Sequence, residues 1–430
     1  MKHFKYAFLL IILFILLSSS ISAKEKNNLI IDFSERFRLV SWDNPITLDS
    51  SKEGGTTFTR NRTSLGLKWK FSKKAEIYFK ATNEFRIYFN PDRDFNIHEI
   101  FVDNLYFKIH DIFSLPVTLT LGRQNIFLGE GFVMMDGGTY DGSRSIYFDA
   151  IRADVNLNDI GKLSVFSLYA QKTDELLPVI NDREQRMNEH DIRGYGFYYQ
   201  RNIDRNKLDL YFLNKKTDIL DNKSWSLSVN TLGTKLSFRI KENLDLTTEG
   251  AIQNGSIDNN KIRTFGGHFH LDRNFANRTL KRVVIGGIYL AGINPGDKVL
   301  RGWEPPFSKW PKWSESYIYT LINEGGIANW NNISSVYISF MTRLFNKGYL
   351  HTTFNILGAP EKNLALDFPG GAGKYRGFLM INRMNFVISK NLTGHFLWEH
   401  FRPGNFYFNG AENYNWIRFE LMYKTKTRRK

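Results

Sequence analysis

Arginine recurs at every second position in several stretches of this 430-residue chain, and carboxylates occur in the same stretches. Residues two apart point to the same side of an extended segment, so each stretch predicts a row of charged groups on one face. A guanidinium group grips a carboxylate through two parallel hydrogen bonds, which predicts binding of anions rather than bond-making chemistry. The candidate binding residues share the polar face of their stretch and are Arg36, Arg38, Arg60, Arg62, Lys80, Glu84, Arg86, Arg152, Asp154 and Arg239.

Arg123 is a further candidate, but its setting differs. It is in phase with Leu121 on the apolar side of its stretch, so a binding role would need a bulge or a position near the rim. All of these charges also allow a second interpretation. Acids such as Glu76, Asp154 and Glu249 would then neutralise the basic side chains, and the charged face would bind no ligand.

The elements that position these side chains are predicted to be β-strands. Apolar and polar residues alternate in runs that begin near residue 31 and continue to residue 423. In the last run, for example, Phe419 lies between Arg418 and Glu420. Alternation of this kind over the whole length is typical of antiparallel strands with one apolar and one polar face.

The connections between the runs distinguish a sandwich from a barrel, because they tend to alternate between long and short. The long ones are predicted near 41–55, 90–96, 125–143, 171–191, 294–331, 358–374 and 401–412. The tight ones are predicted near 72–74, 110–115, 158–161, 202–206, 241–243, 345–348 and 389–391. Long loops at one end and tight turns at the other are typical of an outer-membrane barrel.

We therefore predict an all-β fold, a closed antiparallel transmembrane β-barrel of about 18 strands, with long extracellular loops and short periplasmic turns. Closure gives every backbone polar group a partner within lipid. A barrel of this size is wide enough for an aqueous channel. The apolar face of each strand would then contact outer-membrane lipid, and the polar face would line the lumen.

The N-terminus predicts export. Lys2 and Lys5 precede an unbroken apolar stretch at 6–17, and a small polar segment ends at Ala23. This is the pattern of a secretory signal peptide. We expect residues 1–23 to be the signal peptide, residues 24–430 to form one barrel domain, and the cell outer membrane of a Gram-negative bacterium to be the destination. The chain has no cysteine, so disulfides do not stabilise it.

The charge predicts the partners. Without the two lysines of the signal peptide, the chain keeps 56 basic and 43 acidic side chains, a net charge of +13. A basic surface attracts anionic partners. Because the chain is predicted to be exported, nucleic acid is not expected to be one of them. We expect no nucleic-acid partner and a transported anionic polysaccharide or small anionic solutes.

Two further features are open to more than one interpretation. The long segment at 294–331 carries Trp303, Trp310, Trp313 and Trp330; it could fold inward and constrict the pore, stack on sugar rings, or pack outside on neighbouring loops. His268 and His270 share one face of a strand, but no third metal ligand stands near them in sequence. The sequence shows no nucleophile elbow, so we predict no metal, no cofactor, no catalytic residue and no enzymatic activity.

The chain resembles the alginate-export family of outer-membrane barrels. The likeness rests on Leu121-Gly122-Arg123-Gln124 with the Gly129-Glu130-Gly131 segment after it, and on the strand from Phe148 to Val155. The segment Arg60-Asn61-Arg62 is similar to the first arginine-rich strand of that family, and Phe401-Arg402-Pro403-Gly404 to its penultimate hairpin. The resemblance implies a monomeric barrel of 18 strands with an arginine-lined pore for a polyuronate. It assigns the pore role to Arg60, Arg62, Arg123 and Arg152. One departure is the Lys/Thr/Arg tail after Tyr423: either the assembly signal is internal, or the tail is loose in the periplasm.

The sequence thus predicts an outer-membrane channel with a basic lumen that exports an alginate-like polyuronate by facilitated diffusion. The alternative is an uptake porin for small anionic or general hydrophilic solutes, and a third class is a barrel that does not transport, such as an adhesin or a lipid hydrolase.

Overall fold

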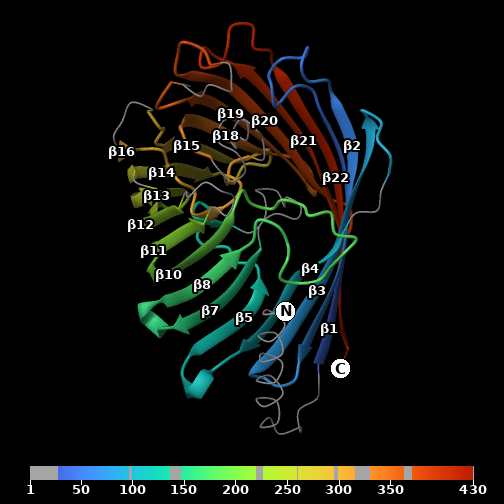
Figure 1. The fold of residues 1–430 in the computed structure, drawn as a ribbon, viewed down its shortest axis with the longest axis vertical. Coiled ribbons are helices and arrows are strands. Elements are labelled where there is room, and N and C mark those ends of the chain that lie inside the picture. The colour runs from blue at the N-terminus through green and yellow to red at the C-terminus, as the bar shows by residue number, and fades with distance from the viewer. Residues whose placement is uncertain are drawn as a thin grey trace.

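A closed antiparallel β-barrel forms nearly the whole of the molecule (Figure 1). The computed structural model describes residues 28–95, 99–135, 147–218, 226–258, 260–294, 299–314, 330–362 and 370–429. The predicted signal peptide lies outside these residues. Among them, no helix is long and apolar enough to cross a membrane.

Each of the 18 barrel strands pairs antiparallel with the next one along the chain. The strands are β1 (Asn28–Trp42), β2 (Thr56–Lys70), β3 (Ala75–Asn90), β4 (Ile100–Ile109), β5 (Val117–Gln124), β7 (Phe148–Asn156), β8 (Lys162–Ala170), β10 (Asp191–Ile203), β11 (Asn206–Asp218), β12 (Ser226–Lys241), β13 (Leu244–Ile257), β14 (Asn260–Asn274), β15 (Leu280–Leu290), β18 (Ile333–Phe345), β19 (Gly348–Gly358), β20 (Tyr375–Val387), β21 (Leu392–Pro403) and β22 (Tyr414–Arg429). The prediction of about 18 antiparallel strands is confirmed.

The barrel closes where β22 pairs with β1, from Trp416 opposite Trp42 to Arg429 opposite Leu29. The tail after Tyr423 is therefore part of the closing strand, and of the two alternatives the loose tail is wrong. Its backbone pairs with β1 over its whole described length, because a closed barrel leaves no strand edge unpaired. The closure also places the charged residues of β22 beside those of β1.

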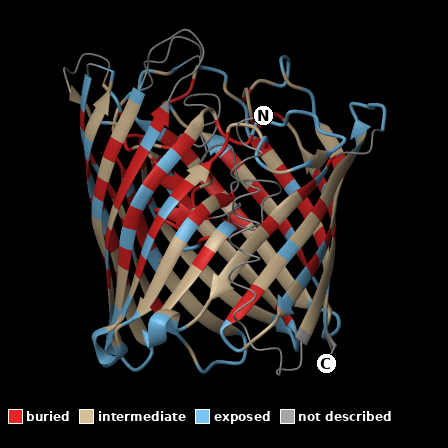
Figure 2. Cartoon of the chain, turned by 60° about the horizontal axis from the view of Figure 1, so that its bottom comes forward, coloured by how far each residue is buried: buried red, intermediate tan, exposed pale blue. Residues whose placement is uncertain are grey.

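The connections sort by length as predicted (Figure 2). The long ones join β1 to β2, β3 to β4, β5 to β7, β8 to β10, β15 to β18, β19 to β20 and β21 to β22 at one end of the barrel, and the tight turns lie at the other end. Two connections at the long-loop end, 219–225 and 258–259, are short and were not predicted. The short 3-10 turns η1 (Ile112–Ser114) and η2 (Asn158–Ile160) lie in the tight connections.

Four two-residue strands lie in the long connections. They are β6 (Met134–Met135), β9 (Val179–Ile180), β16 (Val299–Leu300) and β17 (Phe307–Ser308). β6 and β17 pair with each other, although their connections are far apart in sequence. β9 pairs with the start of β4, and β16 pairs with β14. Long connections are therefore held by backbone pairing as well as by side chains.

The two faces of the wall differ as the alternation predicts. Outward residues such as Ile252 and Val336 are 62% exposed, whereas the inward Tyr198 and Leu213 are fully buried. Most of the buried residues lie in the half of the barrel nearer the long connections (Figure 2). Residues of the long connections therefore fill the lumen at that level.

Candidate functional site

Two segments of the long connections enter the barrel and pack against its inner wall. We call residues 125–135 and 299–314 the inner loops. Phe132 of the first stacks on Trp303 of the second, with ring centroids 5.1 Å apart and planes 17° from parallel. Phe307 contacts the inward Phe148 edge-on at 6.4 Å. Gly266 of β14 has no side chain to displace the Trp303 ring, which lies against its backbone. The inward interpretation of the tryptophan-rich segment thus holds for its described part.

The second inner loop crosses the lumen. At one end, Lys215 of β11 donates to Glu304 at 2.7 Å, and Gln253 of β13 donates to the Glu304 carbonyl at 2.7 Å. At the other end, Ser314 donates to Glu399 of β21 at 2.8 Å. β11 and β21 stand on nearly opposite sides of the ring of strands (Figure 1). The loop is therefore fastened to both walls and narrows the passage.

Facing the end of this loop is the arginine wall, a set of buried or half-buried guanidinium groups on adjacent strands. Its members are Arg36 and Arg38 on β1, Arg60 and Arg62 on β2, Arg86 on β3, and Arg418 on β22. The register places like charges directly opposite one another, Arg36 against Arg62 and Arg38 against Arg60. Such pairs repel, so the wall needs anions to hold it together.

Two glutamates supply part of the negative charge that the arginine wall requires. Glu84 accepts from Arg60 at 2.9 Å, from Arg62 at 3.1 Å and from Arg36 at 3.3 Å. Glu420 accepts from Arg38 and lies 3.4 Å from His395. The arginines still outnumber these acids. Within the described part of the chain the neutralising interpretation therefore fits in part, because six arginines against these two acids leave an excess of positive charge among the groups named here.

Lys309 of the second inner loop adds to this excess. It is 9% exposed, and within the described part of the chain its ammonium group has no hydrogen bond or ion pair. Burial, and then the neighbouring Arg60, lower the pKa of Lys309 to about 8, while Glu189 acts in the opposite direction. A buried cation without an acid partner is costly. An anion placed beside Lys309 would offset this cost.

The predicted residues divide into those that join the arginine wall and those that do not. Arg36, Arg38, Arg60, Arg62, Glu84 and Arg86 come together in it. Lys80, Arg152 and Asp154 also face inward but pair locally, Lys80 with Asp103 and Arg152 with Asp154 at 2.9 Å. Arg239 pairs with Asp245 at the tight-turn end and is partly exposed. These four fit the neutralising interpretation, because their charge is matched by a neighbour.

Arg123 lies apart from the arginine wall, where β4 and β5 separate at the long-loop end. Its guanidinium donates to Asp149 at 2.9 Å, to Asp174 at 2.9 Å and to the carbonyl of Val102 at 2.9 Å. Gly122 before it has a φ of 113°, a conformation that favours glycine. The residue is 1% exposed. Its rim position and its set of partners are those of a structural clamp, and its assignment as a pore-lining residue stays a prediction.

The inner loops also bring a third candidate ligand to the histidine pair. Glu130, His268 and His270 each offer one ligand atom, and these atoms lie within 4.8 Å of one another. Burial acts to raise the pKa of Glu130, but His270 and Lys312 outweigh it and hold that pKa well below its usual range. The sequence gives no hint of this group, because Glu130 is 138 positions before His268 and reaches it only through the inward fold of its loop.

A polar hollow of about 730 Å³ lies below the arginine wall, toward the tight-turn end. Its lining includes Asp32, Arg36, Arg62, Lys80 and Lys424. It offers charged groups of both signs with a surplus of positive ones, as in the wall above it. A solute that has passed the inner loops would meet this hollow next.

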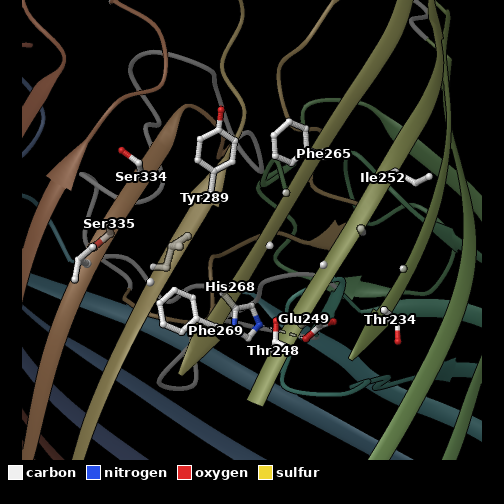
Figure 3. Close-up of a pocket in the computed structure, with 18 of the residues that line it drawn as sticks. Thr234, Thr248, Glu249, Ile252, Phe265, His268, Phe269, Tyr289, Ser334 and Ser335 are labelled. Carbon is white, nitrogen blue, oxygen red and sulfur yellow. Dashed lines mark hydrogen bonds and ion pairs between the residues drawn. The ribbon is translucent and has the colours of Figure 1, made fainter. Parts of the chain in front are cut away.

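A second hollow, of about 1240 Å³, is on the other face of the wall (Figure 3). Outward apolar side chains such as Ile252, Phe265 and Tyr289 frame it. Gly250 and Gly267 stand opposite each other on β13 and β14 and leave its floor without side chains. Apolar groups make up most of its outward border, with Thr234, Thr248 and Ser334 between them, and it lies on the opposite face of the sheet from the arginine wall.

Sequence reasoning missed Arg418, Lys309 and Glu130 as functional candidates. Arg418 lies in an alternating run on the same face as Glu420, so its parity was a usable signal. Lys309 and Glu130 lie in loops, where no periodicity tells which way a side chain points. Their positions become visible only when the loops are seen inside the barrel.

Comparisons with known proteins support the fold. No protein-family model matches the sequence, and no curated protein does. Among solved structures, Acinetobacter baumannii OccAB4 is similar with a TM-score of 0.56 and 10% identity, over 95% of this chain and 100% of that one. The outer membrane protein OpdK from Pseudomonas aeruginosa has a TM-score of 0.58 and 10% identity, over 93% and 99% of the two chains. Pseudomonas aeruginosa OpdK with vanillate gives 0.57 and 9%, over the same shares.

These structures are outer-membrane porins, not alginate exporters. At such low identity the likeness shows the barrel fold alone. The resemblance to the alginate-export family is thus supported only at the level of an outer-membrane barrel, and the particular family is not shown.

Proposed function

We propose that this protein is an outer-membrane channel for the uptake of small anionic solutes, carboxylates above all. The barrel fold and the porins that share it support a channel, and the arginine wall supports anions. Vanillate, which is bound to one of the similar structures, is itself a small carboxylate. This is the alternative of the sequence-based hypothesis, and it replaces polyuronate export as the main one.

The single observation that carries the proposal is the position of Lys309. The second inner loop crosses the lumen and holds this buried ammonium near Arg60, with no ion-pair partner among the described residues. A carboxylate that entered here would pair with Lys309 and approach the arginines as well. The field of the wall would draw anions in, and the narrow passage would bring them close to the guanidinium groups.

The crossing loop also argues for small solutes over a polymer. It is fastened at Glu304 to β11 and β13 and at Ser314 to β21. A polyuronate would have to thread the remaining opening over its whole length, or detach the loop from its buried contacts. A small carboxylate needs neither.

The remaining sequence-based predictions concern export, location and oligomeric state, and we keep them as proposals. We propose that residues 1–23 are removed on export, that the barrel resides in the outer membrane as a monomer, and that its outward face contacts lipid. We propose no enzymatic role, since the excess charge of the arginine wall explains binding without a reaction.

The test is transport by the full barrel in planar bilayers and liposomes. A salt gradient should give a reversal potential that favours anions, and liposome swelling should be faster with small carboxylates than with neutral sugars of equal size. Lys309→Met should lower both effects, whereas Lys52→Met, an exposed loop lysine, should leave them unchanged. Block or passage of polyuronate oligomers, with no preference among small solutes, would overturn the proposal and restore export.

A further inference from the structure

The part of the inner wall under the inner loops carries a cluster of titratable side chains that the proposed transport of anions does not use. His268 and His270 point inward from β14, and Glu130 reaches them from the first inner loop. The Nε2 atom of His270 lies 3.2 Å from Glu130 Oε2. His268 is buried, and its Nδ1 atom has no hydrogen-bond partner among the described atoms. Three potential ligands therefore converge at one point, and one of them is a buried imidazole with an unused nitrogen.

Carboxylates outside this group orient both imidazole rings. His270 Nδ1 is bonded to Asp272, and His268 Nε2 lies 3.3 Å from Glu249 Oε2 (Figure 3). A metal-binding histidine commonly donates its other ring N–H to a carboxylate, which fixes the tautomer and makes the free nitrogen a better ligand. His270 has such a partner on the side away from Nε2, the atom that faces Glu130. In His268 the Nε2 atom lies near both Glu249 and Lys312, so an ion in the place of the ammonium group would bind the nitrogen that faces Glu249.

A cation already occupies the neighbourhood. The ammonium group of Lys312, from the second inner loop, is bonded to Glu130 and lies 3.4 Å from His268 Nε2. The surroundings thus favour positive charge, in contrast to the arginine wall. Glu130 and Lys312 also connect the two inner loops, so whatever replaces this ammonium acts on that connection.

We propose that Glu130, His268 and His270 bind a divalent transition-metal ion such as Zn²⁺, which takes the place of the Lys312 ammonium group. Imidazole and carboxylate are ligands that Zn²⁺ and Cu²⁺ accept. Three protein ligands leave a fourth position for water. Metal binding would break the contact between Glu130 and Lys312 and join the first inner loop to β14 through the ion instead of through the direct contact of Glu130 with His270. The proposal does not depend on the identity of the transported solute.

The experiment is a titration of the folded, detergent-solubilised full chain with Zn²⁺, followed by calorimetry, and with Cu²⁺, followed by electron paramagnetic resonance. Cu²⁺ should show coupling to two imidazole nitrogens. Replacing both ligand histidines (H268A/H270A) or Glu130→Gln should weaken Zn²⁺ binding by about 100-fold or more. His351→Ala, an inward histidine of β19 outside the cluster, is the matched control and should change nothing.

Lys312→Met tests the same site by a gain. Removal of the competing ammonium should strengthen Zn²⁺ binding by about tenfold or more, a result that misfolding cannot imitate. Heat-modifiable migration on gels checks that each variant forms the barrel. The proposal is overturned if wild type binds Zn²⁺ no more tightly than the double-histidine variant, if Cu²⁺ shows no coupling to nitrogen, or if Lys312→Met leaves the affinity unchanged.

Discussion

The inner loops cover one side of the inner wall, which we call the covered side. The opposite side, the facing side, faces the end of the second inner loop across the lumen. On the covered side, β7 to β15 present inward residues such as Phe166, Leu168, Ala170 and Leu213, all buried. On the facing side, β22, β1, β2 and β3 carry the arginine wall. The two sides belong to one sheet with one alternation, and they differ only in which residue types occupy the inward positions.

This difference gives the two sides different parts in holding the fold together. Burial of apolar surface and aromatic packing hold the inner loops on the covered side. The facing side cannot bury its guanidinium groups in the same way, because charges need partners. Packing on the covered side thus holds the inner loops in place. The second inner loop carries Lys309 to the facing side. Substitutions on the two sides should therefore have different consequences.

The largest effect should come from Trp303→Ala on the covered side. The ring stacks on Phe132 and is fully buried, and truncation of a buried aromatic costs about 3–5 kcal/mol. We expect the second inner loop to detach, single-channel conductance to rise and anion preference to fall. Trp69→Ala, on the outward face, is the control. Equal conductance for the two variants would show that the loop does not depend on this packing.

Glu84→Gln on the facing side should have the next largest effect. Glu84 accepts from Arg36, Arg60 and Arg62, and loss of its charge leaves three guanidinium groups with a weaker partner, at a cost of about 3 kcal/mol. We expect a lower unfolding midpoint in urea, with conductance close to wild type and a stronger preference for anions. A fall in anion preference would contradict the assignment of excess positive charge to this wall.

The pH dependence of selectivity should isolate Lys309. Because burial and Arg60 lower its pKa to about 8, about nine-tenths of the groups are charged at pH 7 and about one-tenth at pH 9. Deprotonation removes positive charge, so the preference for anions should decline as the pH rises through 8. Reversal potentials measured from pH 6 to 10 check this. The step should vanish in Lys309→Met; if it persists there, another group is responsible.

The smallest effect should come from Asp245→Asn. Its ion pair with Arg239 is partly exposed at the tight-turn end, with the two side chains 30% and 39% exposed, and surface pairs of this kind contribute about 0.5 kcal/mol or less. We expect unfolding and selectivity close to those of the wild type. A shift as large as that of Glu84→Gln would mean that the charges at this end matter as much as those of the arginine wall.

The sequence by itself determined the barrel. The alternation fixes which side of each strand is apolar, and the alternation of long and tight connections fixes the ends. It also placed Arg36, Arg38, Arg60 and Arg62 on the inward face. Parity is a local property, because side chains two apart share a face in any extended segment. These features can therefore be predicted without knowing the partner of a strand.

Only the tertiary structure decided what the inward residues do. Which arginines share Glu84 depends on the register of β1 against β2 and β3, and the closure of β22 on β1 adds Arg418. The paths of the inner loops depend on aromatic contacts between segments that are more than 160 residues apart. No local pattern encodes such contacts, because burial is set by what the rest of the chain brings close. The same reason separates Lys309, which ends near the arginines, from Lys312, which lies only three residues further on and contacts an acid and a histidine.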